Sequence, residues 1–294
     1  MIRRLSAVLV AALLLPAPAS AWSWATHRYI MRRAIEILPA GIRPFFVEHR
    51  EEIVYRAIDP DLWRDVGWDE ESNHFVNFGA PELGPFPFVA LPRDHTAALE
   101  KFGEAGVKRI GTLPWRLQEM VGNLRRAFEG FPKGSGVAPQ QAVLFSGAAS
   151  HYIQDATQPF HASNDYDGQL SGQRGIHARF EQELLDRFES RLTLKPDSPR
   201  AIPAVRDYAF DTMLASYQKV AAILKADREA IGARDTYDDQ YFEAFFTNVR
   251  PVYEAQLSIA VSATASIVTT AWEQAGRPAL TLPRRAPQKV QRTR

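Results

Sequence analysis

The sequence predicts an all-α fold built as a single multi-helix domain. Apolar residues recur at helical spacing along most of the chain, and convincing strand patterns are few. No internal repeat or clear domain boundary divides the sequence. With 294 residues, the chain is long enough to bury a sizeable core in one large domain.

In the N-terminal half, apolar spacing and proline positions define the expected elements. Residues 24–38 predict a helix that Pro39 stops, and residues 45–58 predict a second helix that ends at Asp59-Pro60. Residues 62–95 are rich in glycine and proline and predict loops. Further helices are expected at residues 95–102, 113–128 and, after a turn at 131–136, 138–154.

In the C-terminal half, the helical pattern continues to the last apolar segment. Helices are expected at residues 175–191, 202–226, 236–246 and 251–274. Residues 255–272 contain no charged side chain, which is also typical of a membrane span. They include several Gln, Ser and Thr residues, too many for a lipid-facing helix, so we predict a buried central helix.

The first 21 residues have the features of a secretory signal peptide. Arg3 and Arg4 precede an apolar run that is too short to span a bilayer, and Ala19-Ser20-Ala21 fits the cleavage rule. An uncleaved anchor is the alternative. We therefore expect a secreted or periplasmic protein, cleaved after Ala21, whose mature chain begins at Trp22.

Charge and cysteine content limit the function classes. Without the two leader arginines, 33 of the 35 basic residues remain against 34 acidic ones, so the mature chain lacks the basic footprint of an avid nucleic-acid binder. There is no cysteine, so an exported protein must draw its stability from its core and any bound metal. Residues 283–294 are basic and predict a disordered tail.

The run from residue 151 to residue 181 carries the strongest chemical signal. The pairs His151/Asp155 and His177/Glu181 have the i,i+4 spacing that places both side chains on one helix face, and His161 lies between them. A single pair of this kind is usually a contact on the helix surface. Two such pairs with a third imidazole between them rarely arise by chance. Zinc prefers imidazole and carboxylate ligands where no thiolate is available. The run therefore predicts a multinuclear zinc site and hydrolytic chemistry.

Two upstream segments offer further ligands. Asp59-Pro60-Asp61 supplies carboxylates, and His74 follows in the loop-rich region. A free α-amino group and carbonyl oxygen at Trp22 would chelate a metal ion, and His27 is close enough in sequence to reach the same ion.

Together these residues resemble the zinc-dependent phospholipase C / P1 nuclease family. The match covers most of the mature chain and is strongest at residues 151–164 and 175–181. It implies that residues 22–282 form a zinc-dependent phospholipase C-like catalytic domain, with the all-α fold of that type and a trinuclear zinc cleft.

The resemblance also implies three Zn²⁺ ions per chain, each with its own ligands. One ion would bind Asp61, His74, His151 and Asp155. A second ion would bind the amino nitrogen and carbonyl oxygen of Trp22, with His27 and Asp155, which would bridge the two ions. The third ion would bind His161, His177 and Glu181 and keep positions open to water. Asp61 fits the family pattern better than Asp59, which remains the alternative.

The implied reaction is attack of a zinc-bound hydroxide on the phosphorus of a phosphodiester. Asp61 is the candidate general base, because a carboxylate beside the attacking water could take its proton. The chain is thus predicted to be a zinc-dependent phosphoric diester hydrolase.

Several substrate interpretations follow. Glu181 and the run His161-Ala-Ser-Asn resemble the phospholipase C branch, which acts on glycerophospholipids at a membrane or micelle surface. The interval between Trp22 and His27 instead resembles the S1/P1-type single-strand nucleases and 3′-nucleotidases, the alternative under which nucleic acid is the substrate. A non-enzymatic, zinc-stabilised helical protein is the second alternative, disfavoured because the third site has only three protein ligands. We expect a monomer without a transmembrane segment.

The choline-binding positions of the family differ in this chain. Choline-preferring members carry aromatic residues where this sequence has Leu62 and Glu71. Trp63, Trp68 and Phe75 are nearby and could form an aromatic cage, although packing is the commoner role of such residues.

Overall fold

The computed structural model describes residues 22–281, and every regular element within that range is helical. The all-α prediction is therefore confirmed. The predicted signal peptide and the basic tail at 283–294 lie outside the described residues. The longer helices are α1 (Trp24–Ile37), α5 (His95–Ile110), α6 (Leu113–Gly130), α7 (Ala138–Thr157), α10 (Val205–Tyr217), α11 (Val220–Ile231) and α12 (Asp239–Gln274).

The short elements cluster between α1 and α5 and again between α7 and α10. They are α2 (Arg43–Glu48), α3 (Arg50–Arg56), α4 (Asp59–Asp65), η1 (Glu71–His74), η2 (Pro81–Leu83), η3 (Pro159–Ala162), α8 (Ile176–Ala178), η4 (Arg179–Glu183), α9 (Leu184–Phe188) and η5 (Glu189–Arg191). Most of the residues expected to bind metal lie on these short elements, of which α3, α4, η1 and η3 pack against α7.

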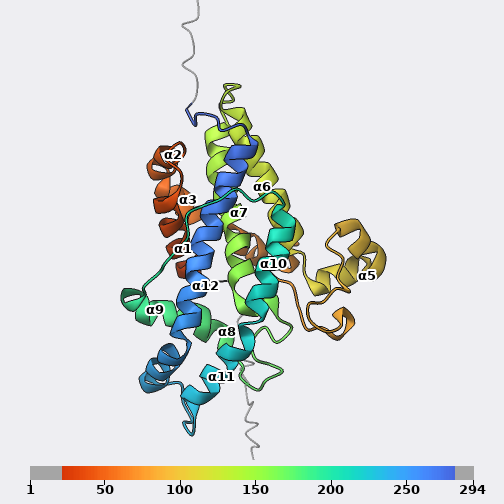
Figure 1. The fold of residues 1–294 in the computed structure, drawn as a ribbon, viewed down its shortest axis with the longest axis vertical. Coiled ribbons are helices and arrows are strands. Elements are labelled where there is room, and N and C mark those ends of the chain that lie inside the picture. The colour runs from red at the N-terminus through yellow and green to blue at the C-terminus, as the bar shows by residue number, and fades with distance from the viewer. Residues whose placement is uncertain (1–21, 282–294) are drawn as a thin grey trace, which may run out of the picture.

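Helix α7 forms the centre of the molecule (Figure 1). It contacts α6, α12, α3, α10 and α1, so its C-terminal half is buried on all sides. Small residues allow this close packing: a Cβ added at Gly147 would lie 2.4 Å from the Cβ of Arg56 on α3. The helix that carries His151 and Asp155 is thereby held rigidly among its neighbours.

Some predicted boundaries were wrong. Asp59-Pro60 begins α4 instead of only ending the preceding helix, because proline is well tolerated in the first turn, where its missing N–H is not needed. The helix expected at 45–58 is divided at His49. The break expected before Pro251 is absent, and α12 runs through the proline as one helix of 36 residues. Dense burial of α12 offsets the cost of that proline.

The uncharged part of α12 has a partner that the sequence did not reveal. Residues 192–202 run extended along it (Figure 1), and their backbone N–H groups donate to side chains of α12. These bonds are Thr193 to Glu254, Lys195 to Ser258, Asp197 to Ser262, Arg200 to Ser266 and Ile202 to Thr270, each between 2.8 and 3.2 Å. We call this segment the strap. The prediction that residues 255–272 form a largely buried helix is confirmed, and their Ser and Thr hydroxyl groups, together with Glu254, accept the hydrogen bonds of the strap.

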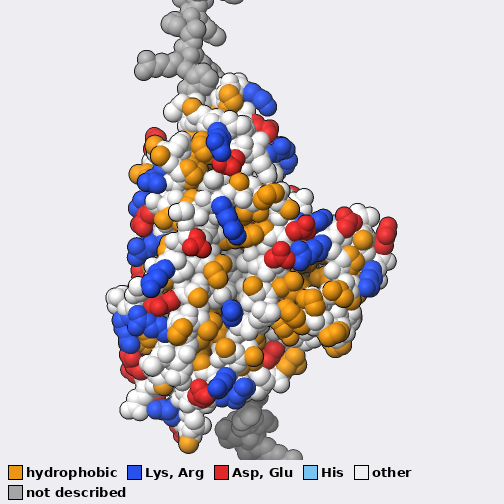
Figure 2. Space-filling view, viewed as in Figure 1, with side chains coloured by type: hydrophobic (Ala, Val, Ile, Leu, Met, Phe, Trp, Pro, Cys, Tyr) orange, Lys and Arg blue, Asp and Glu red, His pale blue; other side chains and the backbone are white. Residues whose placement is uncertain are grey.

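The surface contains one projecting lobe, formed by α5 and the loop before it (Figure 1). Figure 2 shows hydrophobic side chains gathered on its lower part and charged ones along its rim. Phe86 and Val89, in the loop before α5, are 47% and 85% exposed. Across residues 22–281, no helix combines the length and apolar character that crossing a bilayer requires.

Candidate metal centre

The C-terminal half of α7 presents the first two ligand candidates. His151 and Asp155 are one turn apart and fully buried, and His151 Nε2 lies 3.2 Å from Asp155 Oδ2. The other ring nitrogen, Nδ1, is 2.9 Å from the carbonyl oxygen of Ala57. Donation from Nδ1–H to this carbonyl leaves the Nε2 lone pair directed at the carboxylates, as a metal ligand requires.

Asp61 and His74 complete a group around His151. Asp61 Oδ1 is 3.9 Å from both His74 Nδ1 and His151 Nε2, and these two nitrogens are 3.0 Å apart. Asp59, the alternative carboxylate, instead pairs with Arg56 at 3.2 Å and belongs to no group of potential ligand atoms in the described chain. The geometry therefore favours Asp61 over Asp59.

His27, on α1, forms a second group with His151 and Asp155. Its Nε2 atom lies 3.4 Å from Asp155 Oδ1, while Asp155 Oδ2 faces His74 and His151. The two oxygens of one carboxylate thus face two different sets of imidazoles. Trp22 is fully buried beside this group, with its indole N–H donating to the carbonyl of Gln154 at 2.8 Å.

The third group consists of His161, His177 and Glu181. His161 lies on η3, two residues after Pro159. The sequence predicted that His177 and Glu181 lie on one regular α-helix. In the structure, residues 179–183 instead form a π-helical turn. His177 Nε2 and Glu181 Oε2 are nevertheless 2.9 Å apart. Single π-turns are rare and frequently occur at functional sites.

Hydrogen bonds from neighbouring groups hold the third site in place. His161 Nδ1 lies 2.5 Å from the carbonyl oxygen of His74, so one ligand candidate positions another. Gln158 donates from Nε2 to Glu181 Oε2 at 3.1 Å, while its Oε1 accepts from the backbone N–H of Phe160. The Gln158-Pro-Phe-His161 run therefore positions both His161 and Glu181.

Burial keeps three of the histidines neutral near pH 7. It lowers the pKa of His161 to about 3 and that of His177 to about 4, and it also lowers the pKa of His27. Burial likewise raises the pKa of the Glu181 carboxyl well above its usual range. Neutral imidazoles are the form that binds zinc.

His151 behaves differently because carboxylates surround it. Burial alone would lower its pKa, but Asp155 and Asp61 outweigh this effect and raise the pKa to about 9. Asp155 is the converse case: burial would raise its pKa, yet His151 and His161 hold it well below the usual range. A proton on His151 thus compensates buried negative charge, and a bound dication would provide the same compensation.

A second observation, independent of residue spacing, shows that these side chains suit a zinc ion. Among the described residues, most of the buried side-chain nitrogen and oxygen atoms without a hydrogen-bond partner belong to the three groups: His27 Nε2, both oxygens of Asp61, His74 Nε2, Asp155 Oδ1, His161 Nε2 and both ring nitrogens of His177. Buried polar atoms are normally satisfied. Unpartnered imidazole and carboxylate atoms that face one another are what a nitrogen- and oxygen-binding cation such as Zn²⁺ requires.

A cavity of about 310 Å³ opens onto these groups. Its lining includes His74, His161 and His177, together with Arg64, Glu71, Phe75, Asn77, Phe160 and Tyr166. Trp63 and Trp68 stack on each other, with ring centroids 5.8 Å apart, and are not among the lining residues. Of the three predicted cage aromatics, only Phe75 reaches the cavity.

Arg64 is a site residue that the sequence reasoning missed. Its side chain is only 9% exposed, and Nη2 lies 3.4 Å from Asp61 Oδ1 at the cavity wall. The available signal was position, since Arg64 follows Asp61 by three residues and shares its helix face. A guanidinium here adds a binding group for anionic oxygen atoms.

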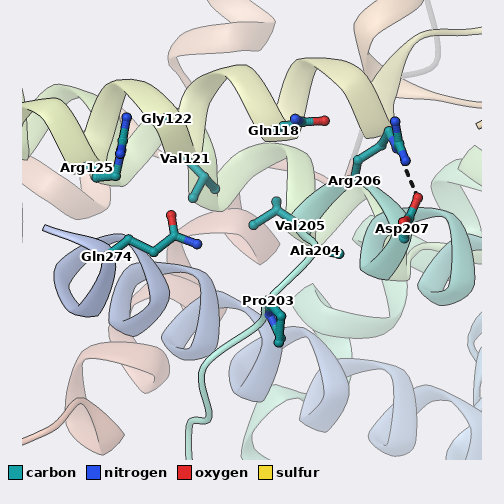
Figure 3. A pocket seen from close by; sticks show the side chains of 10 residues that line it. All are labelled: Gln118, Val121, Gly122, Arg125, Pro203, Ala204, Val205, Arg206, Asp207 and Gln274. Carbon is teal, nitrogen blue, oxygen red and sulfur yellow. Dashed lines mark hydrogen bonds and ion pairs between the residues drawn. The ribbon is translucent and has the colours of Figure 1, made fainter. Parts of the chain in front are cut away.

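A separate cavity of about 340 Å³ lies between α6, the start of α10 and the end of α12 (Figure 3). Its walls carry Arg125, Arg206 and Asp207, the last two paired at 2.9 Å. No candidate metal ligand lines it, so it is distinct from the metal centre.

Comparison with known proteins identifies the family. The model for "Zinc dependent phospholipase C" matches residues 26–245, most of the chain, and this range contains every predicted ligand except Trp22. No curated protein gives a significant match. The solved structure of the alpha toxin from Clostridium absonum is 16% identical, with a TM-score of 0.45; the match covers 82% of this chain and 62% of that one. On the family match, the chain belongs to the zinc-dependent phospholipase C family.

Proposed function

We propose that the protein is a phospholipase C-type phosphodiesterase that uses three zinc ions. One observation carries the proposal: the group of His161, His177 and Glu181 shares no residue with the other two groups, and both of its histidines line the cavity. An ion with three protein ligands keeps a position for water or substrate, which is typical of catalytic rather than structural zinc. This argues against a protein that uses zinc for stability alone.

The ligand groups support the sites expected from the family resemblance. Asp61, His74, His151 and Asp155 would hold one ion, and His27 with Asp155 a second, completed by the amino nitrogen and carbonyl oxygen of a processed Trp22. When bound, zinc would polarise the phosphoryl oxygens of a diester and supply a nucleophile at neutral pH.

The chain's own residues would divide the remaining work. Asp61 has no hydrogen-bond partner for either oxygen and is our candidate to accept the proton of the attacking water. Arg64 would bind a non-bridging phosphoryl oxygen, where negative charge increases in the transition state. Phe75, Phe160 and Tyr166 would exclude water from the rest of the cavity.

The substrate we favour is a glycerophospholipid at a membrane or micelle surface. Glu181 and the run after His161 support the phospholipase branch, as does the family match. The cavity wall carries Arg64 and Glu71, which lie 3.7 Å apart, beside the rings of Phe75, Phe160 and Tyr166. Because a guanidinium lies beside these rings, we infer that a quaternary ammonium group is not the preferred headgroup.

Secretion is part of the same proposal. We infer that residues 1–21 are removed on export, because only cleavage before Trp22 would free the α-amino group that the second site uses. Residues 22–282 would then form the catalytic domain, and 283–294 a basic tail.

A direct assay tests the substrate assignment. Zinc-loaded protein is incubated at matched zinc with dispersions of phosphatidylcholine, phosphatidylethanolamine or phosphatidylglycerol, and separately with single-stranded DNA. Release of diacylglycerol supports the proposal. Cleavage of DNA without lipid hydrolysis would replace it with the nuclease alternative.

That alternative, a single-strand nuclease or 3′-nucleotidase, retains one specific support from the structure. Arg64 would bind the phosphodiester of a nucleic acid as well as that of a lipid. The interval between Trp22 and His27 favours the same interpretation.

A further inference from the structure

Gln154 lies between His151 and Asp155 in sequence, but its side chain contacts His27 on α1. It is fully buried on α7. Its Oε1 atom lies 2.6 Å from Nδ1 of His27, and its Nε2 atom lies 3.3 Å from the hydroxyl of Thr264 on α12. In this structure the amide oxygen faces the histidine and the amide nitrogen faces the hydroxyl, so both ends of the buried amide are hydrogen-bonded.

This orientation determines which nitrogen of His27 carries hydrogen. An amide oxygen can only accept, so Nδ1 must donate to it and Nε2 keeps its lone pair. His27 Nε2 has no hydrogen-bond partner, and its distance of 3.4 Å from Asp155 Oδ1 is longer than a normal N–H···O bond. The lone pair of Nε2 is thus presented to the carboxylate with which it would share an ion.

The backbone of the same residue holds the other part of this site. The carbonyl oxygen of Gln154 accepts the indole N–H of Trp22 at 2.8 Å. One residue therefore contacts both Trp22 and His27, which come from the N-terminal segment, and connects them to α7.

His27 differs from His151 and His161 in the chemistry of its support. The Nδ1 atoms of His151 and His161 face backbone carbonyls, of Ala57 and His74, which no side-chain substitution removes. The Nδ1 atom of His27 faces a side chain. The support of this one imidazole can therefore be deleted without altering a ligand.

We propose that Gln154 is the positioning residue of the metal site that Trp22 and His27 share with Asp155. Its side chain fixes the His27 tautomer and ring orientation, and its carbonyl fixes the Trp22 side chain. The inference rests on the proposed zinc-dependent function. Loss of the group that accepts the second N–H of a metal-bound histidine generally reduces metal affinity 10- to 100-fold, and we expect about that loss at this one site.

The test compares substitutions in α7 of the exported, processed protein, with its first residue identified by sequencing. Gln154→Met keeps the side-chain length but removes the acceptor, Gln154→Glu restores an acceptor, and Gln141→Met places the same methionine at an exposed position of α7. Zinc per chain is measured after dialysis against a graded series of chelator concentrations. Nitrogen-15 NMR reports the His27 tautomer, assigned with His27→Gln.

We expect three zinc ions in the wild type, Gln154→Glu and Gln141→Met, and two in Gln154→Met at chelator levels that the wild type withstands. His27 should carry its proton on Nδ1 in wild type and Gln154→Glu. Three equally retained ions in Gln154→Met, or loss in Gln154→Glu to the same degree, would overturn the proposal. So would an Nε2–H tautomer in the wild type without zinc.

The controls separate this inference from the proposed function. A wild type that binds no zinc contradicts the trinuclear function itself. A wild type with three ions and unaltered Gln154→Met contradicts only the role of Gln154. If Gln154→Met unfolds, Thr264→Val provides the second variant: it leaves Gln154 in place but removes the hydroxyl that orients its amide, and it should lower the affinity of the same site. Unchanged zinc affinity in Thr264→Val would overturn the proposal.

Discussion

The imidazoles of His27 and His151 stack face to face, with ring centroids 4.1 Å apart and planes inclined by 19°. They come from α1 and α7. Each directs its Nε2 atom at a different oxygen of Asp155, at 3.4 and 3.2 Å. Two neutral or singly protonated rings can stack in this way, but two imidazolium ions would repel, consistent with the lowered pKa of His27 beside a raised one at His151.

The first prediction concerns this shared carboxylate. Asp155→Asn should remove two of three zinc ions, because both proposed sites on this side depend on Asp155, while the group at His161 keeps its ion. Activity should fall at least about 100-fold. Elemental analysis after gel filtration measures the zinc content. Loss of a single ion would show that Asp155 does not bridge.

The second prediction separates two neighbouring carboxylates. Asp61→Asn should reduce kcat about 100-fold or more, because it removes both a ligand and the proposed proton acceptor. Asp59→Asn is the matched control, since Asp59 pairs with Arg56 and not with the histidines. Asp59→Asn should retain nearly full activity at saturating zinc. Equal losses in the two variants would reopen the choice between them.

The third prediction concerns acid stability without metal. The folded-state pKa values of His161 and His177, about 3 and 4, lie below the usual 6.5, so the unfolded chain binds protons that the folded chain does not. Stability is therefore fully present above pH 6.5 and falls as the pH drops toward 4.

The lowered pKa of His27 adds to this effect, whereas the raised pKa values of Glu181 and His151 oppose it. Three histidines with lowered pKa outweigh these two groups, so the net change remains destabilising. Chelator-treated protein should lose on the order of a few kcal/mol of unfolding free energy between pH 7 and pH 5. Urea denaturation at each pH measures it. A constant midpoint over this range would contradict the histidine account.

The fourth prediction concerns the guanidinium in the cavity. Arg64→Met should lower kcat/KM about 10- to 100-fold by removing a charged donor to phosphoryl oxygen. Arg64→Lys should recover only part of it, because an ammonium group cannot bind two oxygens in a planar fork. Zinc content should match the wild type in both. Wild-type kcat/KM in Arg64→Met would exclude a contact with the substrate.

The fifth prediction concerns the strap on α12. Thr270→Val leaves the buried backbone N–H of Ile202 without its acceptor and should destabilise the protein by about 1–3 kcal/mol. Ser258→Ala is the milder comparison, because Lys195 N–H is exposed and water can replace the hydroxyl. Calorimetry of the zinc-loaded variants gives both Tm shifts. A larger shift for Ser258→Ala would contradict this ranking.

Whether the sequence predicts a feature depends on how far apart in the chain the interacting residues lie. The pairs His151/Asp155 and His177/Glu181 are local, so spacing alone placed their side chains together. The π-turn that follows His177 was not predictable, because a single π-turn leaves the i,i+4 ligand spacing unchanged. The role of Asp59-Pro60 was misjudged because proline near a helix terminus is compatible with either an end or a start.

Longer-range features had weaker signals. Gln154 and Arg64 are polar residues without a distinctive motif, and only their burial against His27 and Asp61 marks them as site residues. The strap was missed for the same reason: its acceptors lie more than sixty positions away in sequence. The hydroxyl groups of α12 were recognised as incompatible with lipid, but a single sequence does not specify their partners.

The strap and α12 also have matching repeat lengths. Four residues of α-helix advance about 6 Å, and two residues of extended chain advance about 6.6 Å. Acceptors at every fourth position, from Glu254 to Thr270, therefore meet donors at about every second position of the strap. One interval, from Asp197 to Arg200, is longer and contains Pro199, which has no N–H to donate. Inserting one residue elsewhere would displace every later bond, so the strap length is fixed as strictly as the register of a β-ladder.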